Sequence, residues 1–226
     1  MSAAIQLERV TNTKEQTQSI TTISTIPGAA VRGNGFGVLF MAFFGTLWAY
    51  TGIMGLQGWG EPLLLVAAVT VGIALFIGGG SLLRASRRLT NQVSKADVKR
   101  GNRMGIWFNI IFAAEGLAIG ISIAVCNAAS HSELIPLAAA IIVGLHFFPL
   151  ASLFQVRLYH FTGALLCLLP ILTWLFVPVK VMLGEHQILA FMSVVGLGSA
   201  LILWGTGLTI WLMGKRLLSV NTISQR

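Results

Sequence analysis

The chain has 226 residues, of which 55% are hydrophobic and 10% are charged, and its mean hydropathy is +0.82. This composition excludes an ordinary soluble domain, in which about a quarter of the residues are charged. The formal net charge of +8 would suit a nucleic-acid partner, but the positions of the basic residues favour a different interpretation.

Six apolar runs approach or reach the length of about 20 residues that a helix needs to cross a bilayer. They lie at 36–56, 62–83, 104–126, 134–154, 161–179 and 188–213. We therefore expect an all-α, polytopic membrane protein, a bundle of six transmembrane helices over residues 34–216. Segments 1–33 and 217–226 are polar and are expected to be cytoplasmic tails. The first lacks the continuous apolar core of a signal peptide, so we expect it to be retained.

The basic residues mark one side of the predicted membrane domain. If both termini are cytoplasmic, 14 of the 15 Lys and Arg residues lie inside and only Lys180 lies outside. Because cytoplasmic loops carry an excess of Lys and Arg, this distribution predicts a cytoplasmic N-terminus and C-terminus. The positive charge is then a topology signal with some attraction to anionic lipid headgroups, and we expect the bilayer, not nucleic acid, as partner.

Glu115 is the only acid that lies deep inside a long apolar run, since residues 104–126 hold no other charge. An ionisable side chain at mid-membrane costs on the order of 3 kcal/mol on insertion scales and usually faces a protein interior or a watery cavity. Glu115 is therefore the leading candidate for a functional residue.

His146 lies in the fourth predicted span. The loop between the third and fourth spans is short, so these two spans are expected to be antiparallel neighbours. At 1.5 Å per residue, Glu115 lies about 16 Å and His146 about 12 Å from the cytoplasmic ends of their spans. Side chains at similar depth on neighbouring helices can share a proton, as in proton relays and substrate sites. The alternative is a single interhelical hydrogen bond that holds two helices together.

Small and polar residues occupy another face of the third predicted span. Asn109, Gly116 and Gly120 fall within about 40° of one another at 100° per residue, whereas Glu115 points roughly 100° away from Gly116. Gly116-x-x-x-Gly120 is typical of a face that another helix approaches closely, so we interpret it as a helix-packing seam. Asn109, a polar side chain within the bilayer, is also a candidate for the buried polar site.

Two prolines lie inside predicted spans. Pro149 and Pro170 are expected to kink the fourth and fifth helices, since proline removes one backbone hydrogen bond and frees a carbonyl one turn earlier. In the fourth span that carbonyl lies beside His146, where it is a plausible proton or ion ligand. If the helix continues past Pro149, Arg157 and His160 lie on the same side as His146 and could mark a route to the cytoplasm.

The first and third predicted spans share a faint repeat. With an offset of 68 residues, Gly37 matches Gly105, Phe40 matches Phe108, Phe44 matches Phe112, and Gly52 matches Gly120. The pattern suggests tandem helical hairpins arranged as two plus two plus two, although glycine-rich membrane helices also match by chance. The position that matches Glu115 is Leu47, so the helix itself does not require the acid.

Two segments carry a resemblance to known families. Trp107-Phe-Asn-Ile-Ile-Phe-Ala-Ala-Glu-Gly116 and Gly144-Leu-His-Phe-Phe-Pro-Leu-Ala151 resemble parts of small bacterial integral membrane protein families of unknown function. The resemblance covers the third and fourth spans only. It implies no activity, and it fits our expectation of a multi-pass protein of a bacterial inner membrane.

The sequence lacks the motifs of the main classes of membrane enzyme. There is no P-loop, no metal-ligand spacing on any span, no C-x-x-C at Cys126 or Cys167, and no histidine on the sixth span that could activate Ser199 as a nucleophile. We therefore expect no catalytic residues, no metal and no cofactor.

Two functional hypotheses remain. The first is a small secondary carrier or channel-like subunit, for an unknown small molecule or ion, with Glu115 and His146 as a buried protonatable site. The second is a non-catalytic membrane scaffold or partner subunit whose polar residues serve helix packing. Six spans are few for a monomeric carrier, so we expect a homo-oligomer or a membrane partner protein.

Overall fold

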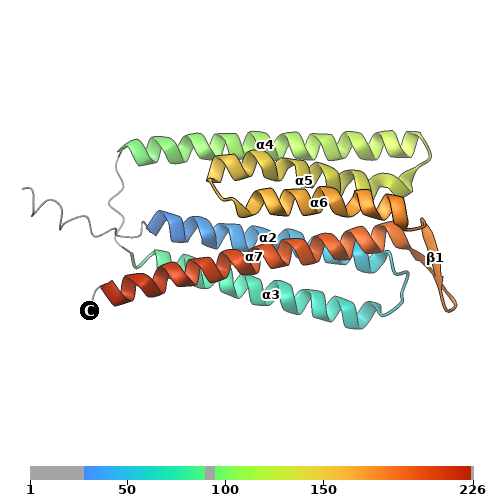
Figure 1. Cartoon of the computed structure of the whole chain (residues 1–226), viewed down its shortest axis with the longest axis horizontal. Helices are drawn as coiled ribbons and strands as arrows, with labels where there is room; N and C mark the ends of the chain where they lie inside the picture. Colours follow the sequence, from blue (N-terminus) through green and yellow to red (C-terminus); the bar gives the residue numbers. More distant parts are fainter. Residues whose placement is uncertain (1–27, 90–94, 225–226) are drawn as a thin grey trace, which may run out of the picture.

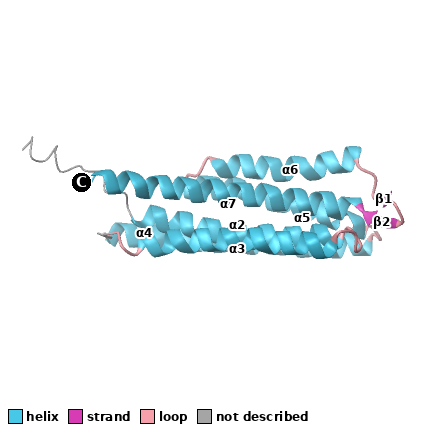
Figure 2. Ribbon diagram, turned by 90° about the horizontal axis from the view of Figure 1, so that it is seen from below, coloured by secondary structure: helices cyan, strands magenta, loops and turns pink. Residues whose placement is uncertain are grey.

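The computed structural model describes residues 28–89 and 95–224. Its long helices are α2 (Gly28–Met54), α3 (Glu61–Ser86), α4 (Lys95–Ala128), α5 (Ile135–Phe154), α6 (Leu158–Phe176) and α7 (Ala190–Ser224). A 3₁₀ turn, η1 (Ser132–Leu134), precedes α5, and the strands β1 (Lys180–Leu183) and β2 (His186–Leu189) precede α7. The helices lie side by side along one long axis, with the strands at one end (Figures 1 and 2).

All six helices are long and apolar enough to cross a membrane, which confirms the prediction of six membrane-spanning helices. Most helices extend beyond their apolar runs, because a backbone that leaves the bilayer keeps its intrahelical hydrogen bonds. Of the predicted tails, residues 28–33 begin α2 and residues 217–224 end α7. The remaining tail residues, 1–27 and 225–226, lie outside the described residues.

The connection between α6 and α7 differs from the prediction. The fifth span was expected to reach residue 179 and the sixth to begin at 188, but α6 ends at Phe176 and residues 188–189 belong to β2. Val177 is extended, with φ −110° and ψ 133°, because the following Pro178 disfavours a helical residue before it. The antiparallel hairpin turns at Gly184, whose φ of +64° suits a tight two-residue turn. The protein is therefore not purely α-helical.

The helices form two groups that share α7 as a neighbour. α2 packs against α3 and α7, whereas α5 packs against α6 and α4, and both α5 and α6 contact α7. α4 lies at the edge of the bundle, next to α5 (Figure 1). The predicted hairpin partners are in contact, and the extensive contact of α2 with α7 additionally brings the first and last helices together.

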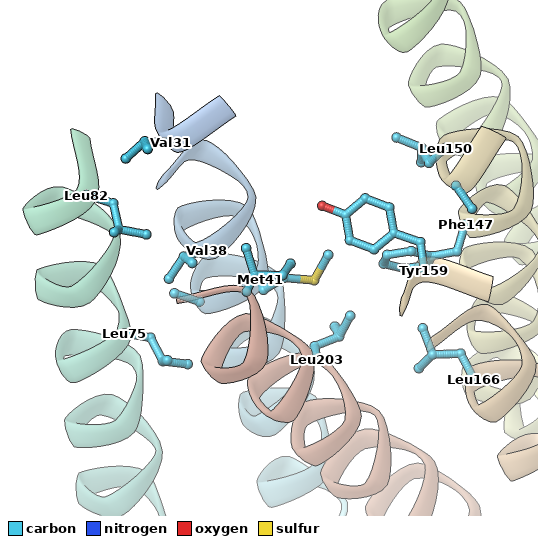
Figure 3. Packing of buried hydrophobic residues seen from close by; sticks show 13 residues of the cluster. Val31, Val38, Met41, Leu75, Leu82, Phe147, Leu150, Tyr159, Leu166 and Leu203 are labelled. Carbon is cyan, nitrogen blue, oxygen red and sulfur yellow. The ribbon is translucent and has the colours of Figure 1, made fainter. Parts of the chain in front are cut away.

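The hydrophobic core runs through the middle of the bundle. Figure 3 shows Val31, Val38 and Met41 facing Leu75 and Leu82 on one side, and Phe147, Leu150, Tyr159, Leu166 and Leu203 on the other. These side chains come from α2, α3, α5, α6 and α7, while α4 supplies only partly buried residues to this cluster. α4 is thus held by fewer buried apolar contacts than the other helices.

Close helix contacts are made at glycines outside the predicted seam. A Cβ added to Gly52 of α2 would lie 2.5 Å from the backbone nitrogen of Leu197 in α7. A Cβ added to Gly144 of α5 would lie 2.9 Å from the carbonyl oxygen of Gly163 in α6. These helices approach so closely because glycine has no side chain at the contact.

The expected seam at Gly116 and Gly120 has no counterpart within the described bundle. A Cβ at either glycine would meet nothing within 4 Å, and both residues are exposed. The physical reason is the helical period, because α4 turns the opposite face toward α5 and so directs these glycines outward. This face is open to lipid or to another chain.

Candidate functional site

One stripe of α4 faces the bundle, and Glu115 lies at its centre. Among residues 101–128, Glu115 is the only one that is buried. The half-buried residues around it recur every three or four positions, which is the spacing of a single helix face: Met104, Phe108, Ile111, Ala118, Ile119, Ser122 and Cys126. The side chain that α4 inserts most deeply is therefore its one acid.

The structure brings Glu115 and His146 together. His146 Nδ1 lies 3.2 Å from Glu115 Oε1, across the contact between α4 and α5. Each side chain exposes only 8% of its surface. Two spans that run in opposite directions thus place their ionisable groups at one depth and in direct contact, at ion-pair distance.

The pair leaves hydrogen-bonding capacity unused. Among the described residues, Glu115 Oε2 is buried and has no hydrogen-bond partner, and the short contact of His146 Nδ1 is not directed as a hydrogen bond. A carboxylate has two oxygens that accept hydrogen bonds, and a protonated carboxyl also donates one. Because a buried polar atom without a partner is unfavourable, the free oxygen is a position where a proton or a ligand would be stabilised.

Charge limits what the pair can hold. With one proton, the pair has no net charge, whether as carboxylate and imidazolium or as carboxyl and neutral imidazole. Adding or removing a proton leaves a net charge in apolar surroundings, which is strongly unfavourable. A bound monovalent cation would restore neutrality if the pair released its proton. Electrical neutrality at this position therefore requires one positive charge, supplied either by a proton or by a bound cation.

Aromatic rings surround this position. The His146 ring lies against Phe147, with 4.6 Å between the ring centroids. Phe112, one turn before Glu115, contacts Phe40 and Phe44 of α2 at centroid distances of 5.7 and 5.9 Å. Phe40 and Phe44 are also the residues that the sequence repeat matched to Phe108 and Phe112. The matched residues meet across the bundle.

Asn109 does not belong to the buried pair. Its side chain is exposed on the outer side of α4, because six residues of α-helix place it about 120° away from Glu115. Its predicted place in a buried polar site is corrected by this finding.

The prolines lie within helices, but the predicted row of basic residues is absent. Pro149 and Pro170 are internal to α5 and α6, and each helix continues past its proline. α5 ends at Phe154, since Gln155 adopts a left-handed conformation with φ 56°. Arg157 therefore directly precedes α6 and His160 lies in its first turn, where the His160 ring lies against Phe148 of α5.

Sequence reasoning missed a polar contact elsewhere in the core. Thr162 of α6 and Thr206 of α7 share a buried hydrogen bond of 2.8 Å between their hydroxyl oxygens. Each hydroxyl oxygen also lies within hydrogen-bonding distance of a carbonyl one turn earlier in its own helix, at 3.1 Å for Thr162 and 2.8 Å for Thr206. With one proton on each hydroxyl, two of these three contacts are hydrogen bonds at any one time. A threonine inside a span commonly makes only that local bond, so sequence gives no signal for the second one.

The described residues offer no second candidate for a catalytic, metal-binding or polar ligand-binding site. Ser199 is fully buried and its hydroxyl has no hydrogen-bond partner. No group of three or more His, Cys, Asp or Glu residues that could hold a metal occurs there. A groove of about 360 Å³ lies between α2 and α3, bordered by Phe43, Leu47 and Phe76, but its lining is almost wholly apolar. The Glu115–His146 pair is thus the best candidate for a functional site among the described residues, because it is a buried contact between two ionisable side chains.

The comparisons with known proteins give a family. The sequence model of DUF7010, described as a family of unknown function, matches residues 32–206. No curated protein and no solved structure matches the chain. The matched region includes Glu115 and His146 and ends within α7. With six helices able to span a bilayer, the chain is an integral membrane protein that belongs to the DUF7010 family of unknown function.

Proposed function

We propose that this protein is a small proton-coupled secondary carrier in which Glu115 and His146 hold the coupling proton. The observation that supports the proposal is the buried contact of 3.2 Å between the two side chains, with the second carboxyl oxygen of Glu115 left without a partner. Buried ionisable residues in membrane spans commonly mark ion and proton pathways.

The carrier mechanism uses the position of α4 at the edge of the bundle. α4 meets its neighbours through one stripe, and the acid is the most buried residue of that stripe. With a proton shared, the pair is neutral and α4 stays docked against α5. Loss of the proton leaves a buried charge, which favours either a bound cation or a hydrated arrangement in which α4 moves outward. The presence or absence of the proton in this way controls whether water and ions can reach the pair.

The test is proton movement into liposomes that contain the purified protein and a trapped pH-sensitive dye. An outward gradient of a monovalent cation, inorganic or organic in separate trials, should drive proton uptake through the wild type, because an exchange of one proton for one such cation moves no net charge and does not respond to a membrane potential. Glu115→Gln should abolish it, because the amide keeps the shape of the side chain but cannot titrate. Glu61→Gln, the same chemical change at the start of α3, serves as the matched control and should leave uptake unchanged. A folded Glu115→Gln protein with undiminished uptake would sink the carrier mechanism.

The second candidate function is a membrane scaffold or partner subunit. It is favoured by the outer face of α4, where Gly116, Gly120 and Asn109 are exposed at positions that suit a close helix partner. Under this alternative, Glu115→Gln is nearly silent, and Gly116→Leu changes the size of the assembly in detergent. Under the carrier mechanism, Glu115→Gln abolishes proton uptake and Gly116→Leu leaves the size of the assembly unchanged.

A further inference from the structure

We infer that the space beside Glu115 binds a hydrophobic monovalent cation in exchange for the shared proton. This inference rests on the proposed carrier function and names the class of substrate. It depends on one juxtaposition, that of a buried carboxylate with a free oxygen beside a cluster of phenylalanine rings.

The cluster fills a gap between two helices. Phe40 and Phe44 of α2 meet Phe108 and Phe112 of α4, and each of the Phe40–Phe108, Phe40–Phe112 and Phe44–Phe112 centroid distances is between 5.7 and 5.9 Å. No Cα atom of α2 comes within 8 Å of one in α4 among the described residues. Only side chains span this gap, and rings can rotate to admit a ligand without separating two tightly packed backbones.

Glu115 lies on the same side of α4 as the rings that α4 contributes. Phe112 precedes it by three residues and Phe108 by seven, so the three side chains share one side of α4. Glu115 exposes 9% of its surface and its Oε2 atom has no partner in the described chain. A ligand that enters among the rings therefore lies on the side of α4 that carries the carboxyl group of Glu115.

The residues around Glu115 favour a ligand that is positively charged and organic over a small inorganic ion. Small hard cations such as Na⁺, Mg²⁺ and Ca²⁺ need several oxygen ligands, whereas this site offers one carboxylate among rings. Aromatic faces attract organic cations through their negative quadrupoles, most strongly where water is excluded. A neutral ligand would leave the deprotonated carboxylate unpaired, and an anion would be repelled by it. A cation with an apolar body satisfies both the acid and the rings.

The ring cluster is exposed on the outer surface of the bundle. Phe43 and Phe112 expose 55% and 37% of their surfaces, and Phe43 contacts Phe44 with 5.1 Å between centroids. The ring cluster thus reaches from the membrane-facing surface toward Glu115. Hydrophobic cations concentrate in membranes, so access from the bilayer suits a substrate of this class.

The test is binding of tetraphenylphosphonium to the purified full-length protein in detergent, measured by calorimetry in two buffers of different ionisation enthalpy. One proton should be released for each cation bound. Affinity should rise about tenfold per pH unit while the site is protonated, because proton and cation compete. Glu115→Gln should abolish binding. Phe112→Leu, which keeps an apolar side chain but loses the ring, should weaken binding about tenfold.

Two controls separate the site from general hydrophobic adsorption. Phe161→Leu removes a ring on α6 that is 70% exposed and should leave affinity unchanged. The uncharged analogue triphenylphosphine oxide should not compete. Equal binding by wild type, Glu115→Gln and Phe112→Leu, or binding without proton release, would overturn the inference. Phe112→Leu and the pH dependence of the wild type keep the test valid even where Glu115→Gln does not fold.

The two proposals fail in different ways. Proton uptake that Glu115→Gln abolishes, together with no tetraphenylphosphonium binding by the folded wild type, overturns the cation inference and leaves the carrier function intact. Proton-linked cation binding without any uptake in liposomes supports the site but overturns the carrier function.

Discussion

Glu115 occupies a position where packing alone would favour an apolar residue. Its counterpart in the sequence repeat, Leu47, is half exposed on α2, so the helices do not share a need for an acid. Replacing a buried ion pair by well-packed apolar residues is often neutral or stabilising. The contact of Glu115 with His146 is therefore better explained by chemistry at the pair than by stability of the bundle.

At this scale we predict strong coupling between the two residues. Glu115→Leu and His146→Leu should each lower the free energy of unfolding by about 1–3 kcal/mol, because each leaves a buried polar partner unsatisfied. The double variant should recover part of this loss, with a coupling energy of about 0.6–2 kcal/mol. Unfolding in detergent, followed by tryptophan fluorescence, measures all four proteins. Strictly additive losses would show that the two side chains do not interact.

At the scale of elements, glycine has opposite roles on different helices. On α2, Gly52 lies where a Cβ would meet the backbone of α7, whereas on α4 the space outside Gly116 is open. The same residue type permits a close helix contact in one place and leaves a bare surface in the other.

This contrast gives a matched pair of substitutions. Gly52→Ala should lower the free energy of unfolding by about 1–3 kcal/mol, because backbone atoms of α7 must move to admit the methyl group. Gly116→Ala should be neutral or stabilising by up to about 1 kcal/mol, since alanine favours a helix over glycine. Thermal unfolding in detergent measures both. Similar losses for the two variants would indicate that another chain covers Gly116.

The spacing of the glycines explains why the sequence did not identify the helix faces that meet within the chain. Gly116-x-x-x-Gly120 fits the known small-residue motif, yet the contacts observed use Gly45 and Gly52 of α2 and Gly72 and Gly79 of α3, each pair seven residues apart. Seven residues are two helical turns, so these pairs also lie on one face. A spacing alone does not tell which glycine face meets a neighbour, because exposed glycines are equally compatible with a lipid-facing surface.

At the scale of the molecule, the number of spans could be predicted and their arrangement could not. A bilayer requires an apolar run for each span, and this signal is read directly from the sequence. In a soluble helix the polar side also reveals which face is buried, but a span is apolar on every side and lacks that signal. Glu115 and His146 are exceptions, since a charge must avoid lipid, and their similar depth on neighbouring spans indicated two faces that could meet. The contact of α2 with α7 could not be predicted in this way, because it involves no ionisable residue that would reveal the buried face of either helix.

The orientation of the bundle is the last property that we predict from charge. The helices run alternately, so the ends that carry Arg32, Arg84 and Lys215 share one side of the bundle and the hairpin with Lys180 lies at the other (Figure 1). The positive-inside rule then predicts that the Lys215 end is cytoplasmic. Two exposed serines offer conservative labelling sites at the opposite ends, Ser130 after α4 and Ser219 near the end of α7.

In a background with Cys126→Ala and Cys167→Ala, a membrane-impermeant maleimide applied to intact cells should modify Ser130→Cys and spare Ser219→Cys. Permeabilised cells should show both sites labelled, which controls for accessibility. The physical reason is that translocating Lys and Arg against the membrane potential is unfavourable, since moving one charge across 100 mV corresponds to about 2.3 kcal/mol. Labelling of Ser219→Cys alone from outside would invert the topology and place the basic ends of the helices outside the cell.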